Sequence, residues 1–201
     1  MLKVLGSLTS PFVRTVRTTC EELGLEYELV QTSFFAKMNA QDEATIQKHN
    51  PVMRVPVLVD GDQGILDSRI ICRYLIEKSG NNNTFQSSFE EKIREENAVS
   101  MIHGAIDAGV LRFILALENA DLNSGYLARS YKRMESCLEA LNAEKQLGQN
   151  FGLAEMMLVC ALEWFKKRSV IDWSGYDHLL SVYNRHKDRP SLVVTRIPET
   201  A

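Results

Sequence analysis

The stretch from Asn50 to Leu75 constrains the fold of this 201-residue chain more than any other. Its apolar run VPVLV at 55–59 has the length of a buried strand. The polar residues at 60–64 include two glycines, as hairpin turns often do, and residues 65–67 favour a second short strand. The stretch therefore predicts an antiparallel hairpin that runs directly into a helix.

That helix begins at Asp67 or Ser68, so its first turn carries an acid and a hydroxyl together. Backbone N–H groups at a helix start have no partner within the helix, and the local potential is positive. Such a place suits an anionic or carboxylate ligand. The alternative is an ordinary Asp or Ser cap that binds nothing.

Composition narrows the partner classes. The chain is 45% hydrophobic and 24% charged with a net charge of −3, so it has no global basic surface and nucleic acid is not favoured. No uninterrupted apolar run approaches the roughly 20 residues of a membrane helix, and residues 1–12 are typical of a first strand, not of a signal segment. Widely spaced cysteines favour reduced core thiols and a cytoplasmic protein. They are Cys20, Cys72, Cys137 and Cys160.

The elements upstream place the hairpin in a mixed sheet. Leu2–Leu5 is expected to be a strand, and Thr9-Ser10-Pro11 then starts a helix that ends at Gly24. A second strand is expected at 27–31 and a short helix at 42–49. Strands joined by a helix pair in parallel, whereas strands joined by a tight turn pair antiparallel. The order βαβ, helix, ββ, helix predicts a thioredoxin-like four-stranded arrangement.

The second half of the chain is expected to be helical. The polar stretch SGNNNTFQSS at 79–88 is the best linker candidate. Beyond it, helical periodicity dominates. The expected helices are 90–118, 124–144, 153–168 and 176–187. The sequence thus predicts an α/β domain at 1–79, a linker at 80–88 and an all-α domain at 89–201.

Three motifs together resemble the cytosolic glutathione transferases, and among them bacterial members with a Ser-Pro-Phe motif. They are SPFVR at 10–14, the V-P strand with its hairpin and Asp-Ser helix start at 55–68, and DRPSLVVTRIP at 188–198. The resemblance spans nearly the whole chain. It implies a thioredoxin-like domain that binds glutathione as co-substrate, a helical second domain and a homodimer.

In that family a Ser, Cys or Tyr near the first helix start lies beside the glutathione sulfur, and Ser10 matches this position. Thr9 is an alternative, and a plain helix cap is another. Lowering a thiol pKa of about 8.5 by roughly two units makes about three quarters of it thiolate at pH 7, for about 2.7 kcal/mol. A hydrogen bond to a charged group and a helix N-terminus supply that much. A serine also counts against thiol reductase chemistry, which needs a cysteine.

The resemblance implies further contacts with glutathione. Val55, before a cis proline, would pair with the cysteinyl part as an added strand, and the Asp67-Ser68 helix start would hold the γ-glutamyl end. Relatives mostly have Glu where this chain has Asp67. Arg54 fits the glycyl carboxylate, with a solvated surface role as the alternative. The expected glutathione-binding set is Phe12, Arg54, Val55, Pro56, Asp67 and Ser68.

Apolar side chains near Ser10 are expected to contact the second substrate, although each candidate also suits a core position. The candidates are Phe34, Phe35, Met38, His103, Ile106 and Phe113. The four histidines lack metal-ligand spacing, so no metal site is expected. Val52 and Met53 fall where relatives often place an apolar dimer contact, with local packing as the alternative.

One helix start departs from the family pattern. Relatives usually have a Ser or Thr cap with Asp three residues later, where this chain has Gly152 and Glu155. Glycine caps nearly as well, and Glu155 can reach back to the cap N–H.

The leading interpretation is a glutathione transferase that acts on a small hydrophobic electrophile, whose identity the sequence leaves open. A non-catalytic binding module and a glutathione-dependent peroxidase or isomerase are the alternatives.

Overall fold

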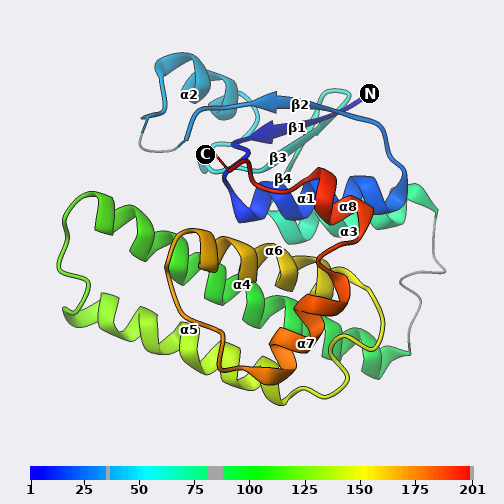
Figure 1. Cartoon of the computed structure of the whole chain (residues 1–201). Helices are drawn as coiled ribbons and strands as arrows, with labels where there is room; N and C mark the ends of the chain where they lie inside the picture. The colour runs from blue at the N-terminus through cyan, green and yellow to red at the C-terminus, as the bar shows by residue number, and fades with distance from the viewer. Residues whose placement is uncertain (35–36, 81–87, 200–201) are drawn as a thin grey trace. The chain divides into compact units, whose positions relative to one another are not determined.

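The computed structural model describes residues 1–34, 37–80 and 88–199. The chain forms two compact units (Figure 1). The first comprises Met1–Gln86 and Arg189–Ala201, and the second comprises Ser87–Asp188. The predicted linker at 80–88 lies largely outside the described residues.

The first unit is built on a mixed sheet with the strand order β2-β1-β3-β4. Its strands are β1 (Leu2–Gly6), β2 (Tyr27–Gln31), β3 (Val57–Asp60) and β4 (Gln63–Leu66). β1 pairs in parallel with β2 and antiparallel with β3, and β3 pairs antiparallel with β4. The thioredoxin-like arrangement predicted from the sequence is therefore confirmed.

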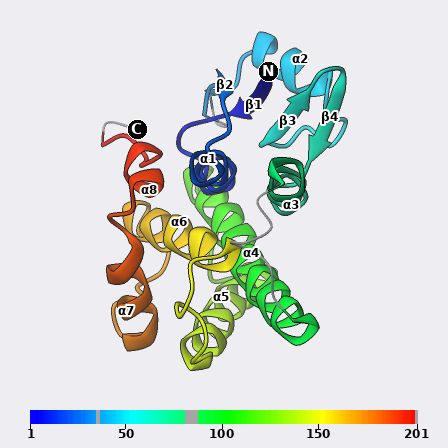
Figure 2. The same cartoon turned by 90° about the vertical axis from the view of Figure 1, so that its right-hand side faces the viewer.

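Helices cover both faces of this sheet. α1 (Pro11–Leu23) and α3 (Ser68–Ser79) lie side by side on one face, and α2 (Ala40–Gln47) lies on the other (Figures 1 and 2). α1 has its N-cap at Ser10 and ends at Gly24, whose left-handed backbone lets its N–H reach the last carbonyls of the helix. Both ends agree with the sequence prediction.

The hairpin turn lies within the predicted one but is shorter, and β4 begins two residues earlier than predicted. Asp60 pairs with Gln63, so Gly61 and Asp62 alone form the turn, and β4 begins before Gly64. Gly61 has φ +60°, a backbone conformation that glycine adopts without strain. At the other end, pairing with β1 begins at Val57, which leaves 55 and 56 outside the strand.

The C-terminal segment packs with the first unit, which differs from the expected domain at 89–201. α8 (Pro190–Val194) contacts α1. The Arg14 side chain is fully buried, and its guanidinium donates to the Leu192 carbonyl at 3.1 Å. Arg189 donates to the Glu22 carboxylate at 2.8 Å. A buried guanidinium requires acceptors, and a carbonyl 178 residues along the chain supplies one.

The second unit is a helical bundle. It contains α4 (Phe89–Leu117), α5 (Gly125–Ala143), α6 (Leu153–Lys167) and α7 (Asp177–His186). Every predicted boundary of these helices lies within one residue of the observed one. By length and composition alone α4 is suited to cross a membrane, but apolar core helices share these properties, and α4 packs along α5 and α6 (Figure 2).

Two carboxylates complete the N-terminus of α6. Glu155 accepts the backbone N–H of Gly152 at 2.9 Å, as predicted, and that of Gly148 at 2.8 Å. Glu95, from α4, accepts the Leu153 N–H at 3.1 Å. A Cβ at position 152 would lie 2.6 Å from that Glu95 oxygen. Glycine at the cap therefore makes room for an acceptor from another helix, and this acceptor replaces the missing Ser or Thr.

Candidate functional site

One edge of the sheet in the first unit collects the polar residues singled out from the sequence. β1 and β2 run in one direction, β3 runs in the opposite direction, and β4 runs back again. Four segments at the ends of strands therefore meet at this edge. They are the end of β1 with the loop at 7–10, the end of β2 at Thr32, the segment 54–56 before β3, and the start of α3 after β4. This set of four segments is called the site edge below.

Gly6 lets two of these segments approach each other. It ends β1 with φ +155°, and a Cβ there would overlap Val13 Cγ2 and lie 3.2 Å from Val55 Cβ. Only a residue without a side chain permits such contact between β1, the first turn of α1 and the segment before β3.

Ser10 stands at the start of α1 and is half-buried. Its hydroxyl oxygen accepts the Val13 N–H at 3.3 Å, and its own N–H donates to the Ser7 carbonyl at 3.1 Å. The predicted cap is therefore confirmed. Within the described ranges the hydroxyl proton is not donated to any acceptor, so it is available to a ligand.

Thr9, the alternative to Ser10, is tied to Ser7. The two hydroxyl oxygens lie 2.9 Å apart, and Ser7 Oγ also accepts the Thr9 N–H at 3.3 Å. Ser7 is 8% exposed. The sequence interpretation did not single out Ser7, although Ser-x-Thr before a helix is a pattern in which a hydroxyl bonds the backbone two residues on.

The Val55–Pro56 peptide bond is cis, as the family resemblance implied. Buried Asn50 holds the preceding loop through its side chain. Its side-chain NH2 donates to the Arg54 carbonyl at 2.7 Å, and its side-chain oxygen accepts the Val52 N–H at 2.8 Å. The Arg54 side chain is exposed. In the part of the chain that the structure describes, the Val55 N–H and C=O have no hydrogen-bond partner.

The start of α3 carries both expected residues. Asp67 is the N-cap, with φ +67°, and its carboxylate accepts the backbone N–H of Arg69 at 2.9 Å. The Arg69 side chain also donates to both Asp67 oxygens, at 3.2 and 3.1 Å. Ser68 is 3% exposed, and its hydroxyl has no hydrogen-bond partner among the described residues. Arg69 was missed at the sequence level; an arginine two residues after a capping acid was the available signal.

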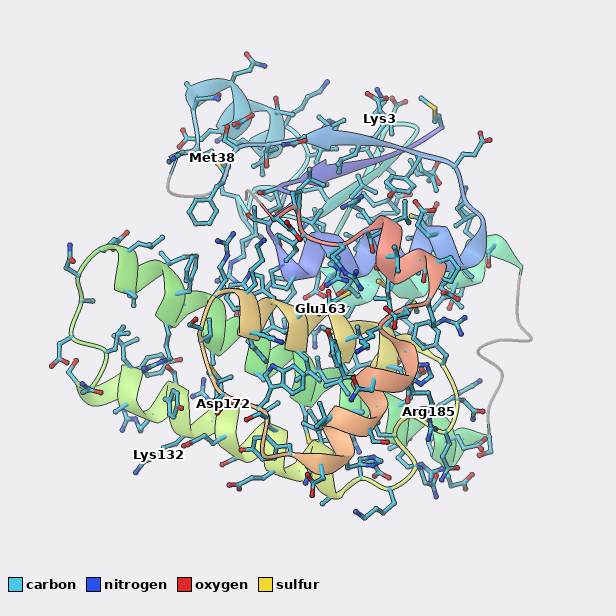
Figure 3. All side chains as sticks on the ribbon, viewed as in Figure 1. Lys3, Met38, Lys132, Glu163, Asp172 and Arg185 are labelled. Atoms are coloured by element: carbon cyan, nitrogen blue, oxygen red, sulfur yellow. The ribbon has the colours of Figure 1, made fainter. Side chains whose placement is uncertain are left out.

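The candidates for the second substrate are spread over both units. Phe34 and Met38 are half-buried in the segment between β2 and α2, where Figure 3 labels Met38. Phe35 lies outside the described residues. In the second unit His103 is half-buried, Ile106 is fully buried, and Phe113 packs edge-on against Trp164 with ring centres 5.7 Å apart. The role of these side chains toward a substrate remains a prediction.

Among the described residues, no group of three or more His, Cys, Asp or Glu side chains could hold a metal ion. All four cysteines are free thiols, and burial raises the pKa of Cys20 to about 12. A thiol with such a pKa remains protonated and unreactive near neutral pH.

Comparisons with known proteins identify similar chains. Residues 4–83 match the family described as glutathione S-transferase, N-terminal domain. Glutathione S-transferase Z1 of Arabidopsis thaliana is 24% identical over 198 residues, which cover 94% of this chain and 89% of that protein.

Two solved structures are similar over nearly the whole chain. A glutathione transferase family member from Pseudomonas fluorescens Pf-5, with bound glutathione, is 25% identical with a TM-score of 0.85 and coverage of 98% and 100% of the two chains. A glutathione S-transferase from Methylobacillus flagellatus KT, with GSH bound, is 22% identical with the same TM-score and coverage. Residues 4–83 therefore form a glutathione S-transferase N-terminal domain, and the chain as a whole has the glutathione transferase fold, with a thioredoxin-like N-terminal domain and a helical C-terminal part.

Proposed function

We propose that this protein joins the thiolate of glutathione to a small hydrophobic electrophile, with the thiolate stabilised by the Ser10 hydroxyl. The observation that carries the proposal is the site edge, where one compact unit presents Ser10, Val55 and Ser68 together. The two similar structures with bound glutathione support the choice of ligand.

The binding part of the proposal rests on groups without protein partners. The buried Ser68 hydroxyl has no partner in the described residues, and a buried unsatisfied hydroxyl costs about 1–3 kcal/mol. The γ-glutamyl carboxylate of glutathione would satisfy it at the start of α3, where the helix also favours negative charge. The Val55 N–H and C=O would pair with the cysteinyl backbone.

Asp67 has a shared role in this proposal. Its carboxylate already accepts from the Arg69 side chain, with 35% of the Asp67 side chain exposed. The α-ammonium of glutathione would therefore join an existing ion pair. Arg69 in turn adds positive charge beside the γ-glutamyl carboxylate.

The chemical part rests on Ser10. Its hydroxyl accepts from Val13, which leaves its proton to donate to the sulfur at the N-terminal end of α1. The thiol proton passes to solvent as the thiolate forms. The thiolate then attacks the electrophilic carbon, a C–S bond forms, and a leaving group such as halide departs with the bonding electrons. Ser10 forms no covalent bond.

Two serine variants separate binding from activation. Ser68→Ala should raise KM for glutathione with little change in kcat, because it removes a contact that is present before and during the reaction. Ser10→Ala should lower kcat/KM about tenfold or more and move the pH profile upward, because it removes a donor to a charged atom.

Ser79→Ala, at the far end of α3, is the matched control and should behave as the wild type. If the wild type shows no glutathione binding by calorimetry, the proposal is wrong. If glutathione binds but an aryl halide is not turned over, the protein is a binding module. Faster turnover of a hydroperoxide would indicate a peroxidase.

The proposal also includes assembly as a cytoplasmic homodimer. Val52 and Met53 are 63% and 39% exposed, so these two adjacent apolar side chains are accessible to a partner surface. Val52→Glu should shift the mass measured by light scattering from dimer to monomer. A wild type that is monomeric at micromolar concentration would contradict this part alone.

A further inference from the structure

A third hydroxyl in the loop between β1 and α1 has no role in the proposed reaction. Ser7 accepts the Ser10 N–H through its carbonyl at 3.1 Å and the Thr9 N–H through its hydroxyl at 3.3 Å. The same hydroxyl lies 2.9 Å from the Thr9 hydroxyl. One nearly buried residue thus holds both residues that are candidates for contacting the sulfur.

Counting protons assigns the direction of the Ser7–Thr9 hydrogen bond. A hydroxyl donates one proton and accepts up to two. The Ser7 oxygen already accepts the Thr9 N–H, and the Thr9 hydroxyl is the one acceptor that the described contacts offer to the Ser7 proton. If Ser7 did not donate to Thr9, a nearly buried hydroxyl would keep an unsatisfied proton, which is costly.

With Ser7 as the donor, the proton of the Thr9 hydroxyl takes no part in this hydrogen bond. Thr9 is half-buried, and no protein acceptor for its hydroxyl proton occurs in the described ranges. The Ser10 hydroxyl likewise has a proton without a protein acceptor in the described ranges, because its oxygen accepts the Val13 N–H and its proton is not donated. The loop therefore presents two adjacent hydroxyl protons just before the N-terminal turn of α1.

We propose that Ser7 is a positioning residue that fixes the Thr9 hydroxyl as a second hydrogen-bond donor to the glutathione sulfur, beside the donor from Ser10. The inference rests on the proposed function of the same site and deepens it. Ser7 touches neither the sulfur nor the electrophile; it acts through Thr9. A hydrogen bond accepted by Thr9 from Ser7 also strengthens the bond that Thr9 donates, because hydrogen bonds in a chain polarise one another.

A double-mutant cycle tests whether Ser7 acts through Thr9. The variants are Ser7→Ala, Thr9→Val and the double variant, assayed for kcat/KM across pH and for the pKa of the bound glutathione thiol by ultraviolet absorbance. Thr9→Val should lower kcat/KM about tenfold, which is the loss of one hydrogen bond to a charged group, and raise the thiol pKa by about one unit. Ser7→Ala should have a smaller effect in the same direction, about three- to tenfold.

The interaction between the two sites decides the outcome. Because Ser7 acts through Thr9, adding Ser7→Ala to Thr9→Val should change kcat/KM less than about twofold. Thr9→Ser, which keeps the hydroxyl, should retain most of the activity. Equal effects of Ser7→Ala in the presence and absence of the Thr9 hydroxyl would overturn the inference, and so would a Thr9→Val variant with the thiol pKa of the wild type.

Unfolding in urea is measured for each variant, so that a loss of activity through loss of folding is distinguished from a direct effect on the site. Ser79→Ala serves as the matched control, since it also removes a partly buried local hydrogen bond, 2.8 Å from Ser79 Oγ to the Ile76 carbonyl. Failure of the proposed function itself would appear as absent glutathione binding in the wild type. Failure of the present inference would leave the wild type active and Ser7 independent of Thr9.

Discussion

Replacing Gly6 with alanine is expected to damage stability and glutathione binding together. Gly6 ends β1 at the point where the first turn of α1 and the segment before β3 come closest. An added Cβ overlaps Val13 Cγ2, lies 3.3 Å from Val13 Cγ1 and 3.2 Å from Val55 Cβ. Val13 donates to the Ser10 hydroxyl, and Val55 presents the backbone groups proposed to pair with glutathione.

The magnitude has two parts. Overpacking of this kind costs about 1–3 kcal/mol, and an L-residue at φ +155° costs about 1–3 kcal/mol more. The expected loss in the free energy of unfolding is therefore about 2–6 kcal/mol, out of a typical 5–15 kcal/mol. Gly24→Ala is the matched control, because Gly24 has φ +63° with nothing within 4 Å of an added Cβ. It should cost only about 1–2 kcal/mol.

Urea unfolding and calorimetric titration with glutathione measure both effects. Gly6→Ala should bind glutathione more weakly even when it is fully folded, whereas Gly24→Ala should bind as the wild type does. Adding Val13→Ala removes the overlapping methyl groups, so the double variant should be at least about 0.5 kcal/mol more stable than the sum of the single effects. A Gly6→Ala variant with wild-type stability and affinity, or strict additivity with Val13→Ala, would refute the steric argument.

Three further predictions concern structural carboxylates. Glu95→Ala should lower the free energy of unfolding in urea by about 1–2 kcal/mol. Gly152→Ser should recover part of this loss in Glu95→Ala but should destabilise the wild type, where the added Cβ would lie 2.6 Å from the Glu95 oxygen. Equal effects of Gly152→Ser in both backgrounds would contradict the cap assignment. Burial raises the pKa of Glu155 above its ordinary value of 4.5. The stability that the protonated side chain contributes is therefore fully present below pH 4.5 and is lost as the pH rises through the folded-state pKa. Over this pH range the wild type should lose stability relative to Glu155→Gln, and a difference between the two proteins that does not change with pH would contradict the prediction. Glu22→Ala should lower the free energy of unfolding by about 1–3 kcal/mol because it removes the acceptor that holds Arg189 and Ser191, and a loss below about 0.5 kcal/mol would show that the contact is not stabilising.

Local signals in the sequence predicted most of the first unit. A hydroxyl followed by proline placed the Ser10 cap, and an acid and a hydroxyl after an apolar strand placed the start of α3. These features depend on a few neighbouring residues, so one sequence carries them. The cis bond at Val55–Pro56 was different, because it came from the family resemblance; local rules give such a bond a frequency of only about 5–6%.

Contacts between distant residues were not predictable. Arg14 meets Leu192 across 178 residues, and Glu95 meets Leu153 across 58, so neither leaves a local pattern. The contact of Ser7 with Thr9 is short in sequence, but it depends on how the loop after β1 turns. The start of the second hairpin strand was predicted two residues too late because Gly61 and Gly64 both suit a turn, and pairing with β3 decides between them.

The pKa of the thiol of bound glutathione tests the central claim most directly. It is measured by ultraviolet titration of the thiolate in the wild type and in Ser10→Ala, at glutathione concentrations that saturate both. We expect a pKa about two units below the ordinary value of about 8.5 in the wild type, and a rise of one unit or more in Ser10→Ala. An unshifted pKa in the wild type, or the same lowered pKa in both proteins, would contradict the assignment of Ser10.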